Sequence, residues 1–508
     1  MMNSNSKTGA NLLAHNTVLN FIGQIIPLLC GVVAIPVTIK TLGIDAFGIL
    51  SLAWLILGYF NIFDLGLSRS ITKYVSECLG KGEIQTIPKI VWTSIGTQLI
   101  IGLIVTGLCV IFIPFFVDHF FKIPADLIKE ATLTFYIIAV ALPVVLLSIG
   151  FKGVLEASQR FDLVNWIKIP ANSLFFIVPA VFGLLGYRLS GIVLLLSSIK
   201  IISMIGYIIF CFKVFPNLKT SVTFEIKVLK NIISFGSWVT VTAVLTSVLL
   251  YVERFFIASL LSVRMLSYYS VPYEVLSRLN IFPYSMSLAL FPAFSHYSAK
   301  GTVNLEEMFL RPIKYLFILM LPIVIFLFIF SKEILIYWLG SSFAENGNTV
   351  FQLLVFALFL NSLAFIPFTC VQGLGRADLK AKFDIIETIL FIILLLSLIP
   401  LYGINGAASS KLIIMLMDFC FLIWVSHKLI RFTKKRLFDY KIIRTLVIGV
   451  IFSLVTIISW FILSKLVILI LFLCVSCIYI FIIWQYAMDD KDKMTIKGII
   501  KVRDSFPR

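Results

Sequence analysis

The stretch IVWTSIGTQLIIGLIVTGLCVIFIPFFV (Ile90–Val117) decides the class of fold, because apolar residues dominate it and none of its residues is charged. A helix needs about 20 apolar residues to cross the roughly 30 Å of hydrocarbon in a bilayer. Runs of this kind recur from Thr17 to Trp484. Because backbone groups in hydrocarbon must bond to one another, long apolar runs favour spanning helices. The chain is therefore predicted to be an all-α polytopic membrane protein.

The composition excludes a soluble globular protein. Of the 508 residues, 60% are hydrophobic and only 13% are charged, whereas a soluble domain carries roughly 25% charged residues. The first apolar run continues past the length of a signal peptide without a small-residue cleavage site, so we expect no segment to be removed. Cysteines Cys474 and Cys477 lie three residues apart, but no histidine or second cysteine pair completes a metal site.

We predict about fourteen spanning helices, each of roughly 20 residues. They are Val18–Val37, Phe47–Leu67, Ile90–Val117, Thr132–Gly153, Ile167–Leu185, Leu189–Phe212, Ile232–Leu260, Tyr268–Phe294, Ile313–Phe330, Val350–Val371, Ile385–Leu401, Gly406–Val425, Thr445–Leu463 and Leu466–Tyr486.

The net charge of +17 reflects membrane topology. With the amino terminus inside, the alternating connections and the span ends beside them hold about 31 Lys and Arg residues on the cytoplasmic side and about 8 outside, as the positive-inside rule requires. The richest connection, Lys428–Arg444, would lie beside anionic headgroups. We therefore expect both termini in the cytoplasm and no nucleic-acid partner.

The chain repeats itself weakly at an offset of about 220 residues, as transporters built from duplicated bundles do. Gly186–Gly191 corresponds to Gly403–Gly406, and two further pairs of segments match: Gly153–Ala157 with Gly373–Ala377, and Arg160–Asp162 with Lys382–Asp384. Six helices per half is an even number, so the halves would be parallel repeats with two helices appended. Chance similarity among glycine-punctuated apolar segments is the alternative.

These boundaries divide the chain into seven parts. They are a cytoplasmic amino terminus (1–16), an N-lobe of six helices (17–213), a cytoplasmic linker (214–230), a C-lobe of six helices (231–427), a basic cytoplasmic loop (428–444), two further helices (445–486) and a cytoplasmic carboxyl-terminal tail (487–508). The cleft between two such lobes is the natural place for a substrate.

Two short segments carry a family resemblance. Leu42–Gly48 reads LGIDAFG, and Phe63–Leu67 reads FDLGL at the end of the second span. With the helix number, the two halves and the loop Gly373–Asp378 (GLGRAD), they resemble the polysaccharide biosynthesis or oligosaccharide flippase family. That family belongs to the multidrug/oligosaccharidyl-lipid/polysaccharide exporter superfamily. The motifs identify the superfamily better than the substrate.

The resemblance implies a V-shaped pair of lobes in the bacterial cytoplasmic (inner) membrane, working by alternating access. The implied cargo is an undecaprenyl-diphosphate-linked oligosaccharide repeat of O-antigen, capsule or exopolysaccharide. The first, second, seventh and eighth helices would line the cavity. Membrane lipid and other polysaccharide assembly proteins are the further partners implied, and no cofactor is expected. The first span, Val18–Val37, contains no charged residue, so any cavity charge that this helix supplies in relatives is missing.

Charged side chains inside the spans are the candidates for function, because an ionisable group at the bilayer centre costs roughly 2.5–3.5 kcal/mol on insertion scales. At about 1.5 Å per residue, Arg278 of the eighth span and Lys200 of the sixth fall near the midplane. Five other candidates lie less centrally: Glu253, Arg254, Glu274, Lys411 and Asp418.

Glu274 and Arg278 are four residues apart, so they can pair on one helix face, in a span that Pro272 and Pro283 interrupt. In the structural interpretation, the two charges neutralise each other, which allows a polar helix to insert into the membrane. In the functional hypothesis, Arg278 and Arg254 bind the diphosphate, because a planar guanidinium binds phosphate oxygens bidentately. Glu274 would then hold Arg278 until the lipid diphosphate displaces it.

Glu253 and Arg254 are adjacent and point about 100° apart, so one of them could instead reach the outer headgroups. Lys200 and Lys411 occupy corresponding spans of the two halves and are candidates for substrate binding. Asp418 lies two turns beyond Lys411, as part of either a structural Lys–Asp network or an ion-coupling site. Asp418 and Glu253 are the candidates for carrying a coupling proton.

Three tyrosines of the eighth span have two interpretations. They could stack on sugars in the cleft or anchor the helix at the membrane interface; they are Tyr268, Tyr269 and Tyr273.

Two other functions fit less well. A multidrug or metabolite antiporter of the same superfamily usually has twelve helices and relies on acidic residues, whereas this chain has an extra helix pair and arginines. A membrane-embedded polymerase or glycosyltransferase would need organised chemistry outside the hydrocarbon, which the outer connections Asp118–Ala131 and Ser331–Thr349 lack. We therefore expect a transporter rather than an enzyme, without catalytic residues or a metal.

Overall fold

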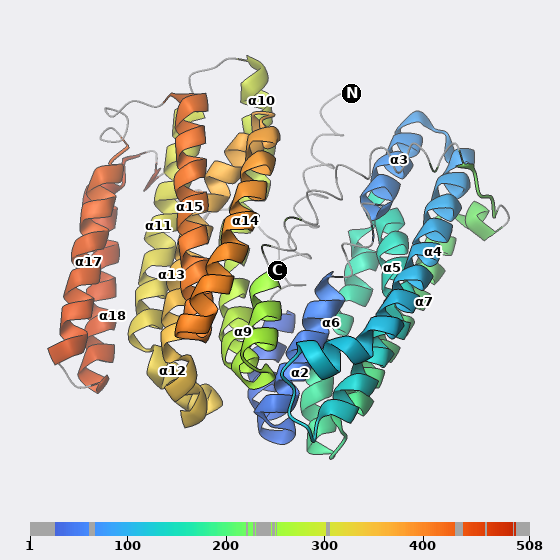
Figure 1. Cartoon of the computed structure of the whole chain (residues 1–508). Coiled ribbons are helices and arrows are strands. Elements are labelled where there is room, and N and C mark those ends of the chain that lie inside the picture. The colour runs from blue at the N-terminus through green and yellow to red at the C-terminus, as the bar shows by residue number, and fades with distance from the viewer. Residues whose placement is uncertain are drawn as a thin grey trace, which may run out of the picture. The chain divides into compact units, whose positions relative to one another are not determined.

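The computed structural model describes residues 26–59, 64, 67–219, 222–226, 229, 245, 249, 251–300, 305–431, 440–462, 465–490, 492 and 493. Every regular element in this part of the chain is helical, as Figure 1 shows. Ten of the described helices are long and apolar enough to cross a membrane. The predicted all-α, polytopic fold class is confirmed.

The helices have the following bounds: Ile26–Leu42, α2 (Ile44–Tyr59), α3 (Leu67–Lys81), α4 (Ile87–Phe115), α5 (Ile128–Ala157), α6 (Phe161–Leu184), α7 (Leu189–Val214), residues 251–260, α9 (Val263–Ser277), α10 (Ile281–Lys300), α11 (Leu305–Ile329), α12 (Ser331–Leu339), α13 (Ser341–Gly373), α14 (Ala377–Tyr402), α15 (Ile404–Ile430), α17 (Ile442–Ile462) and α18 (Lys465–Ile482). Single 3₁₀ or π turns extend or join them: η2 (Ile84–Thr86), η3 (Phe116–Phe120), η4 (Pro216–Lys219), η5 (Arg278–Asn280) and η6 (Ile483–Ala487).

Two predicted segments differ from the structure. The outer connection Ser331–Thr349 is not a loop: it forms α12 and the first turns of α13. α12 is too short to span a bilayer, so a search for long apolar runs misses it, yet its Leu335 is fully buried. The predicted eighth span, Tyr268–Phe294, is broken into α9, η5 and α10.

Several predictions lie outside the described residues. They concern the amino terminus (1–16), residues 18–25 of the first span, most of the seventh span, residues 432–439 of the basic loop and the tail from 494 onwards.

The connections α5–α6 and α13–α14 have the same backbone. Gln159 and Gly375 each adopt a positive φ, 57° and 75°. The amide of the next residue, Arg160 or Arg376, then donates a hydrogen bond of 3.0 Å to the carbonyl five residues earlier. This pattern is the Schellman helix ending. Two helices in different halves of the chain therefore end in the same way.

The side chains after these turns also match. Arg160 holds Asp162 through Nε–Oδ1 and Nη2–Oδ2 contacts of 2.9 and 2.8 Å. Arg376 holds Asp378 through the equivalent contacts of 3.0 and 3.3 Å. The structural counterpart of Arg160 is thus Arg376, not a residue of Lys382–Asp384 as the sequence comparison suggested. Hydrogen bonding, which residue similarity does not reveal, corrects the register of this segment.

The chain forms two compact units, residues 1–275 with 388–407 and residues 276–387 with 408–508. In the first unit, α5 packs against α3, α4 and α7, and Figure 1 shows α4, α5 and α7 side by side. Apolar side chains from α3 to α7 form its core, including Ile71, Val91 and Val154. These two units are defined by contacts within the chain and are not the predicted lobes. The lobe boundaries at 213 and 231 remain a prediction.

Helix α9 belongs to the first unit because it approaches α2 very closely. A Cβ atom at Gly48 would lie 2.0 Å from the carbonyl oxygen of Val263 and 3.0 Å from the hydroxyl of Ser267. That hydroxyl donates a 2.7 Å hydrogen bond to the carbonyl of Ile44. Only glycine permits this approach, which explains the glycine at the end of the LGIDAFG segment.

Charged groups continue this contact at the start of both helices. Arg264 of α9 donates from Nε to Asp45 of α2 at 3.0 Å, and its Nη2 binds the other carboxylate oxygen. Lys122, in the connection after η3, donates to the carbonyl of Leu260 at 2.5 Å. We call the contacts of Asp45, Gly48 and Lys122 with residues 260–267 the α2–α9 contact.

In the second unit, the last helix pair docks on α11. Apolar side chains of α11, α17 and α18 form one cluster that includes Ile325, Phe452 and Phe472. After the end of α18, Asp492 forms an ion pair with Lys314 of α11, and both side chains are fully buried. The Lys314 amine also donates to the carbonyls of Tyr440 and Ala487, at 3.1 and 3.4 Å.

Arg311, one turn before Lys314, completes this charged cluster. It pairs with Glu307 at 2.9 Å, with Asp489 at 2.7 Å and with Asp492. Partial burial alone would raise the pKa of Asp489, but hydrogen bonds from Arg311 outweigh it and lower that pKa to about 2. We call Arg311, Lys314, Asp489 and Asp492 the carboxyl-terminal latch.

We predict that Asp492→Asn destabilises the protein by about 3–5 kcal/mol, because it leaves the buried ammonium of Lys314 without its counter-charge. Asp490→Asn, two residues away on an exposed side chain, is the matched control. Thermal unfolding of both variants in detergent micelles measures the difference. Equal midpoints for the two variants would show that the latch contributes no stability.

Candidate functional site

The structure places the seven candidate residues in three groups. Glu253, Arg254 and Glu274 meet where the helix 251–260 faces α9. Lys200 lies on α7. The remaining three belong to the second unit: Arg278 in η5, and Lys411 and Asp418 on α15.

Arg254 forms the centre of the first group. Its Nη1 lies 2.8 Å from Oε1 of Glu274, and its side chain is only 2% exposed. The guanidinium lies over the rings of Tyr273 and Tyr251, with its Cζ 4.7 and 5.7 Å from the ring centroids. Its Nε has no hydrogen-bond acceptor among the described residues. The guanidinium therefore keeps donor capacity beyond the ion pair.

Glu253 and Tyr269 extend this group. The Tyr269 hydroxyl donates to Oε1 of Glu253 at 3.4 Å, and the rings of Tyr269 and Tyr273 stack with centroids 6.1 Å apart and 14° between planes. Glu253 and Tyr269 are fully buried, and Tyr268 is 3% exposed. This burial disfavours the alternatives in which Glu253 or Arg254 reaches the headgroups and Tyr268 or Tyr269 anchors at the interface.

Arg278 sits where the eighth span breaks. Pro283 lacks the N–H that would bond to the carbonyl four residues earlier, so the regular α-helical hydrogen bonding is interrupted near this point. The chain forms the 3₁₀ turn Arg278–Asn280 and restarts as α10 at Ile281. A cation here follows the carbonyl end of α9, which favours positive charge. The interruption therefore places the positive charge of Arg278 next to the carboxyl-terminal end of α9, inside the predicted span.

Glu274 was predicted to hold Arg278 on its own helix. The structure adds an ion pair between Glu274 and Arg254 of the preceding helix, and the contact with Arg278 stays a prediction. Spacing along one helix identifies neighbours on that helix only, so the contact between helices was not predictable from the pattern of i and i+4 charges.

The second unit holds a lysine surrounded by three carboxylates. Lys380 Nζ lies 2.6 Å from Asp384 and 3.0 Å from Glu387, both on α14, and 2.5 Å from Asp418 on α15. Side-chain exposure is between 2% and 13% for all four. One ammonium therefore faces three carboxylates, and we call these residues the Lys380 cluster.

The Lys–Asp network predicted around Asp418 exists, but Lys380 is the lysine that pairs with it. Lys411, the lysine expected there, is 3% exposed on α15. Sequence reasoning missed Lys380, Asp384 and Glu387 because they lie at the start of the span. Their spacing of four and seven residues, which puts them on one helix face, was the available signal.

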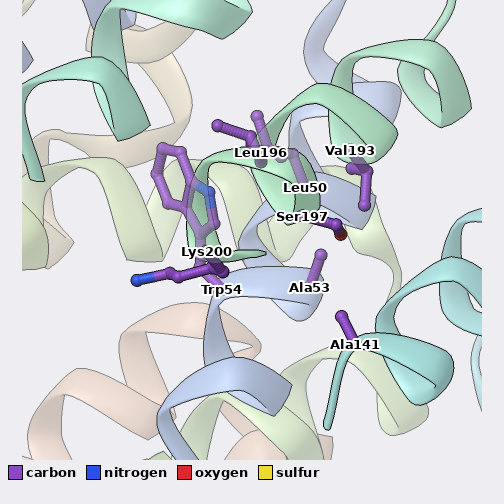
Figure 2. Close-up of a pocket in the computed structure, with 8 residues that line it drawn as sticks. All are labelled: Leu50, Ala53, Trp54, Ala141, Val193, Leu196, Ser197 and Lys200. Carbon is purple, nitrogen blue, oxygen red and sulfur yellow. The ribbon is translucent and has the colours of Figure 1, made fainter. Parts of the chain in front are cut away.

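Lys200 borders a small cavity between α2, α5 and α7. Figure 2 shows its side chain extending beside the ring of Trp54. The cavity of about 10 Å³ holds about one water molecule. The Lys200 amine lies 5.3 Å from the centroid of Phe175, and no carboxylate among the described residues pairs with it. The cavity is too small for a sugar or a lipid headgroup.

The FDLGL segment has a structural role at Asp64. Its carboxylate accepts hydrogen bonds from the amide of Ser68, at 3.1 Å, and from the amide nitrogen of Gln98, at 2.6 Å. The first bond caps the start of α3. The second ties that start to α4. Asp64 thus links the start of α3 to α4.

These features define a polytopic membrane protein: many apolar helices, ionic contacts buried between them and an interrupted span. Its fold is the one found in lipid flippases and drug exporters. Lipid II flippase MurJ, in an inward closed conformation, has a similar structure, with a TM-score of 0.69 and 15% identity over 92% of this chain and 99% of MurJ. An inward-facing multidrug resistance MATE family transporter of the MOP superfamily is also similar, with a TM-score of 0.68. The two chains are 14% identical, and the match covers 81% of this chain and 98% of the transporter.

The family model described as "Polysaccharide biosynthesis protein" matches residues 13–298. The chain belongs to this family, which confirms the resemblance drawn from the LGIDAFG and FDLGL segments. A Shigella flexneri protein named as an O-antigen transporter is 28% identical over 414 residues, which cover 81% of this chain and 97% of that protein.

Proposed function

We propose that this protein is a flippase that exports undecaprenyl-diphosphate-linked oligosaccharide repeats of O-antigen, capsule or exopolysaccharide across the cytoplasmic membrane by alternating access. Arg254 carries the proposal, because a guanidinium buried in a span, with a donor still free, is the group that an anionic lipid substrate requires. The similarity to a protein named as an O-antigen transporter supports the same substrate class.

The chemistry around Arg254 suits both parts of such a substrate. A planar guanidinium binds two phosphate oxygens at once, and Glu274 holds it in place until a diphosphate displaces the carboxylate. Arg278, four residues after Glu274 in the sequence, remains a second candidate for binding the diphosphate. The stacked rings of Tyr269 and Tyr273 provide flat faces of the kind on which sugars pack. Lys200 and Lys411 remain candidates for contacts with the substrate.

We predict that Arg254→Ala and Arg278→Ala each reduce export at least about tenfold, because a hydrogen bond to a charged group contributes roughly 1.5–3 kcal/mol. The measurement is accumulation of undecaprenyl-diphosphate-linked oligosaccharide in the cytoplasmic leaflet after deletion of the gene, followed by rescue with each variant. Arg254→Lys, which keeps the charge without the bidentate fork, should rescue only in part.

Two controls separate binding from folding. Arg160→Gln removes an exposed arginine and should rescue fully. Arg254→Gln combined with Glu274→Gln removes both partners of the ion pair, so it leaves no unpaired charge and should fail to rescue at normal expression. Full rescue by Arg254→Ala would refute the role of this residue. Normal surface polysaccharide with no trapped intermediate would point to the antiporter.

The α2–α9 contact supports a role as an outer gate. In the predicted topology α2 and α9 both begin on the outer side of the membrane, so the ion pair Asp45–Arg264 and the close approach at Gly48 would keep that side shut. Alternating access requires such a contact to open and close in each cycle. We propose that the contact separates when the substrate leaves.

We predict that a disulfide between Asp45→Cys and Arg264→Cys abolishes export, because it fixes the α2–α9 contact. Oxidation should stop export and reduction should restore it, in cells that carry the double variant in a background without the eight native cysteines. Each single-cysteine variant is a control. Undiminished export after complete cross-linking would reject the gate.

The Lys380 cluster supports ion coupling through Asp418. Three carboxylates around one ammonium leave an excess of negative charge in a buried place, which a bound proton would reduce. Glu253, buried beside Arg254, is the second candidate. Both assignments follow from burial and charge.

We predict that Asp418→Asn or Glu253→Gln removes the dependence of export on the proton gradient, since neither amide can take up and release a proton near neutral pH. Transport of the lipid-linked oligosaccharide into vesicles with an imposed pH gradient provides the measurement. The exposed Asp378→Asn is the control. A dependence identical to that of the unaltered protein rules out the substituted residue as the carrier.

A further inference from the structure

An apolar groove of about 800 Å³ runs between α6 and α7, away from the charged clusters. Gly206 and Ile167 line it where the two helices are in contact: a Cβ atom at Gly206 would be 2.9 Å from Cδ1 of Ile167. Its walls include Ile202 and Trp166, whose side chains are 68% and 73% exposed. The groove thus lies between two membrane-spanning helices, with a glycine in its lining and large apolar side chains at its sides.

The length of the groove matches one leaflet of a bilayer. Its lining on α6 begins at Asp162 and ends at Leu174, a distance of about 18 Å at roughly 1.5 Å per residue. The hydrocarbon of one leaflet is about 15 Å thick, half of roughly 30 Å. An extended fatty-acyl chain therefore fits the groove from end to end, whereas a polyisoprenyl chain many units long would extend beyond it.

The one charged residue in the lining of the groove lies at one end of it. Asp162 lies at the start of α6, where its charge is balanced by Arg160 at 2.8 Å. On α7, the face that lines the groove continues at three- and four-residue steps through Ile202, Gly206 and Phe210 to Lys213. Lys213 is therefore at the same end of the groove as Asp162.

The rim at this end combines an aromatic wall with a cation. Trp166 of α6 and Phe210 of α7 meet edge to face with centroids 5.9 Å apart. The Lys213 amine lies 5.9 Å from the centroid of Phe210 and has no carboxylate partner among the described residues. Exposed tryptophan and lysine side chains are the groups that proteins place at the headgroup level of a membrane.

We propose that this groove is a binding site for an anionic phospholipid of the cytoplasmic leaflet. One acyl chain lies between α6 and α7, and the phosphate accepts hydrogen bonds from Lys213. The predicted topology places the start of α6 and the end of α7 on the cytoplasmic side, where anionic headgroups attract lysine. The site is independent of the exported substrate and does not rest on the proposed function.

Photo-crosslinking to phosphatidylglycerol tests the proposal. The full-length protein carries benzoylphenylalanine at Ile202, inside the groove, or at Leu194, an exposed position on the same helix outside it. In vesicles of phosphatidylglycerol and phosphatidylcholine, position 202 should give several-fold more phosphatidylglycerol adduct than position 194. Ala171→Phe, which fills the groove, should remove this excess. Val181→Phe, outside the groove on the same helix, should leave it unchanged.

The charge and the occupant are tested separately. Lys213→Gln should abolish the preference for phosphatidylglycerol over phosphatidylcholine while adducts still form at position 202. Equal labelling at 202 and 194 would overturn the proposal, because it describes bulk lipid. Displacement of phosphatidylglycerol by an equimolar polyprenyl phosphate would also overturn it, because the occupant would then be an isoprenoid chain. Neither outcome depends on whether Ala171→Phe folds.

Discussion

A charged side chain inside hydrocarbon must meet an opposite charge or water, and this requirement organises the structure. Arg254 with Glu274 and Lys380 with Asp418 each join two helices that are consecutive in the chain, and Lys314 with Asp492 joins α11 to the segment after α18. Apolar packing cannot choose among many similar helix faces, because lipid tails are as apolar as leucine. Ion pairs between helices specify which faces meet.

The fold class could be predicted because it depends on length and composition, both of which are plain in the sequence. Runs such as Ile90–Val117 admit one physical solution, a spanning helix. Errors arose where a segment was short or kinked. The short helix α12 was not predicted because nine residues cannot span a bilayer. The interruption at Arg278 was indicated by Pro283, but a proline identifies the position of a kink and not its geometry.

Most residues of the candidate site could be predicted from the sequence, but the ion pairs that they form could not. Burial cost selects Arg254, Glu274 and Asp418 as residues that need a partner, and all three have one. The partners come from other helices, and a single sequence carries no record of which helices touch. Lys380 shows the limit best: it lies in the first turn of α14, where a lysine is unremarkable until its contact with Asp418 of α15 is known.

The carboxyl-terminal latch has a consequence for biogenesis. Arg311 and Lys314 enter the membrane early, whereas Asp489 and Asp492 follow about 178 residues later in the chain. At a synthesis rate of roughly 5–20 residues per second, α11 spends about ten seconds or more with two cations awaiting their carboxylates. During this interval the insertion machinery or lipid headgroups must shelter the positive charge. The ionic contacts of α11 therefore form only after residues 489–492 have been synthesised.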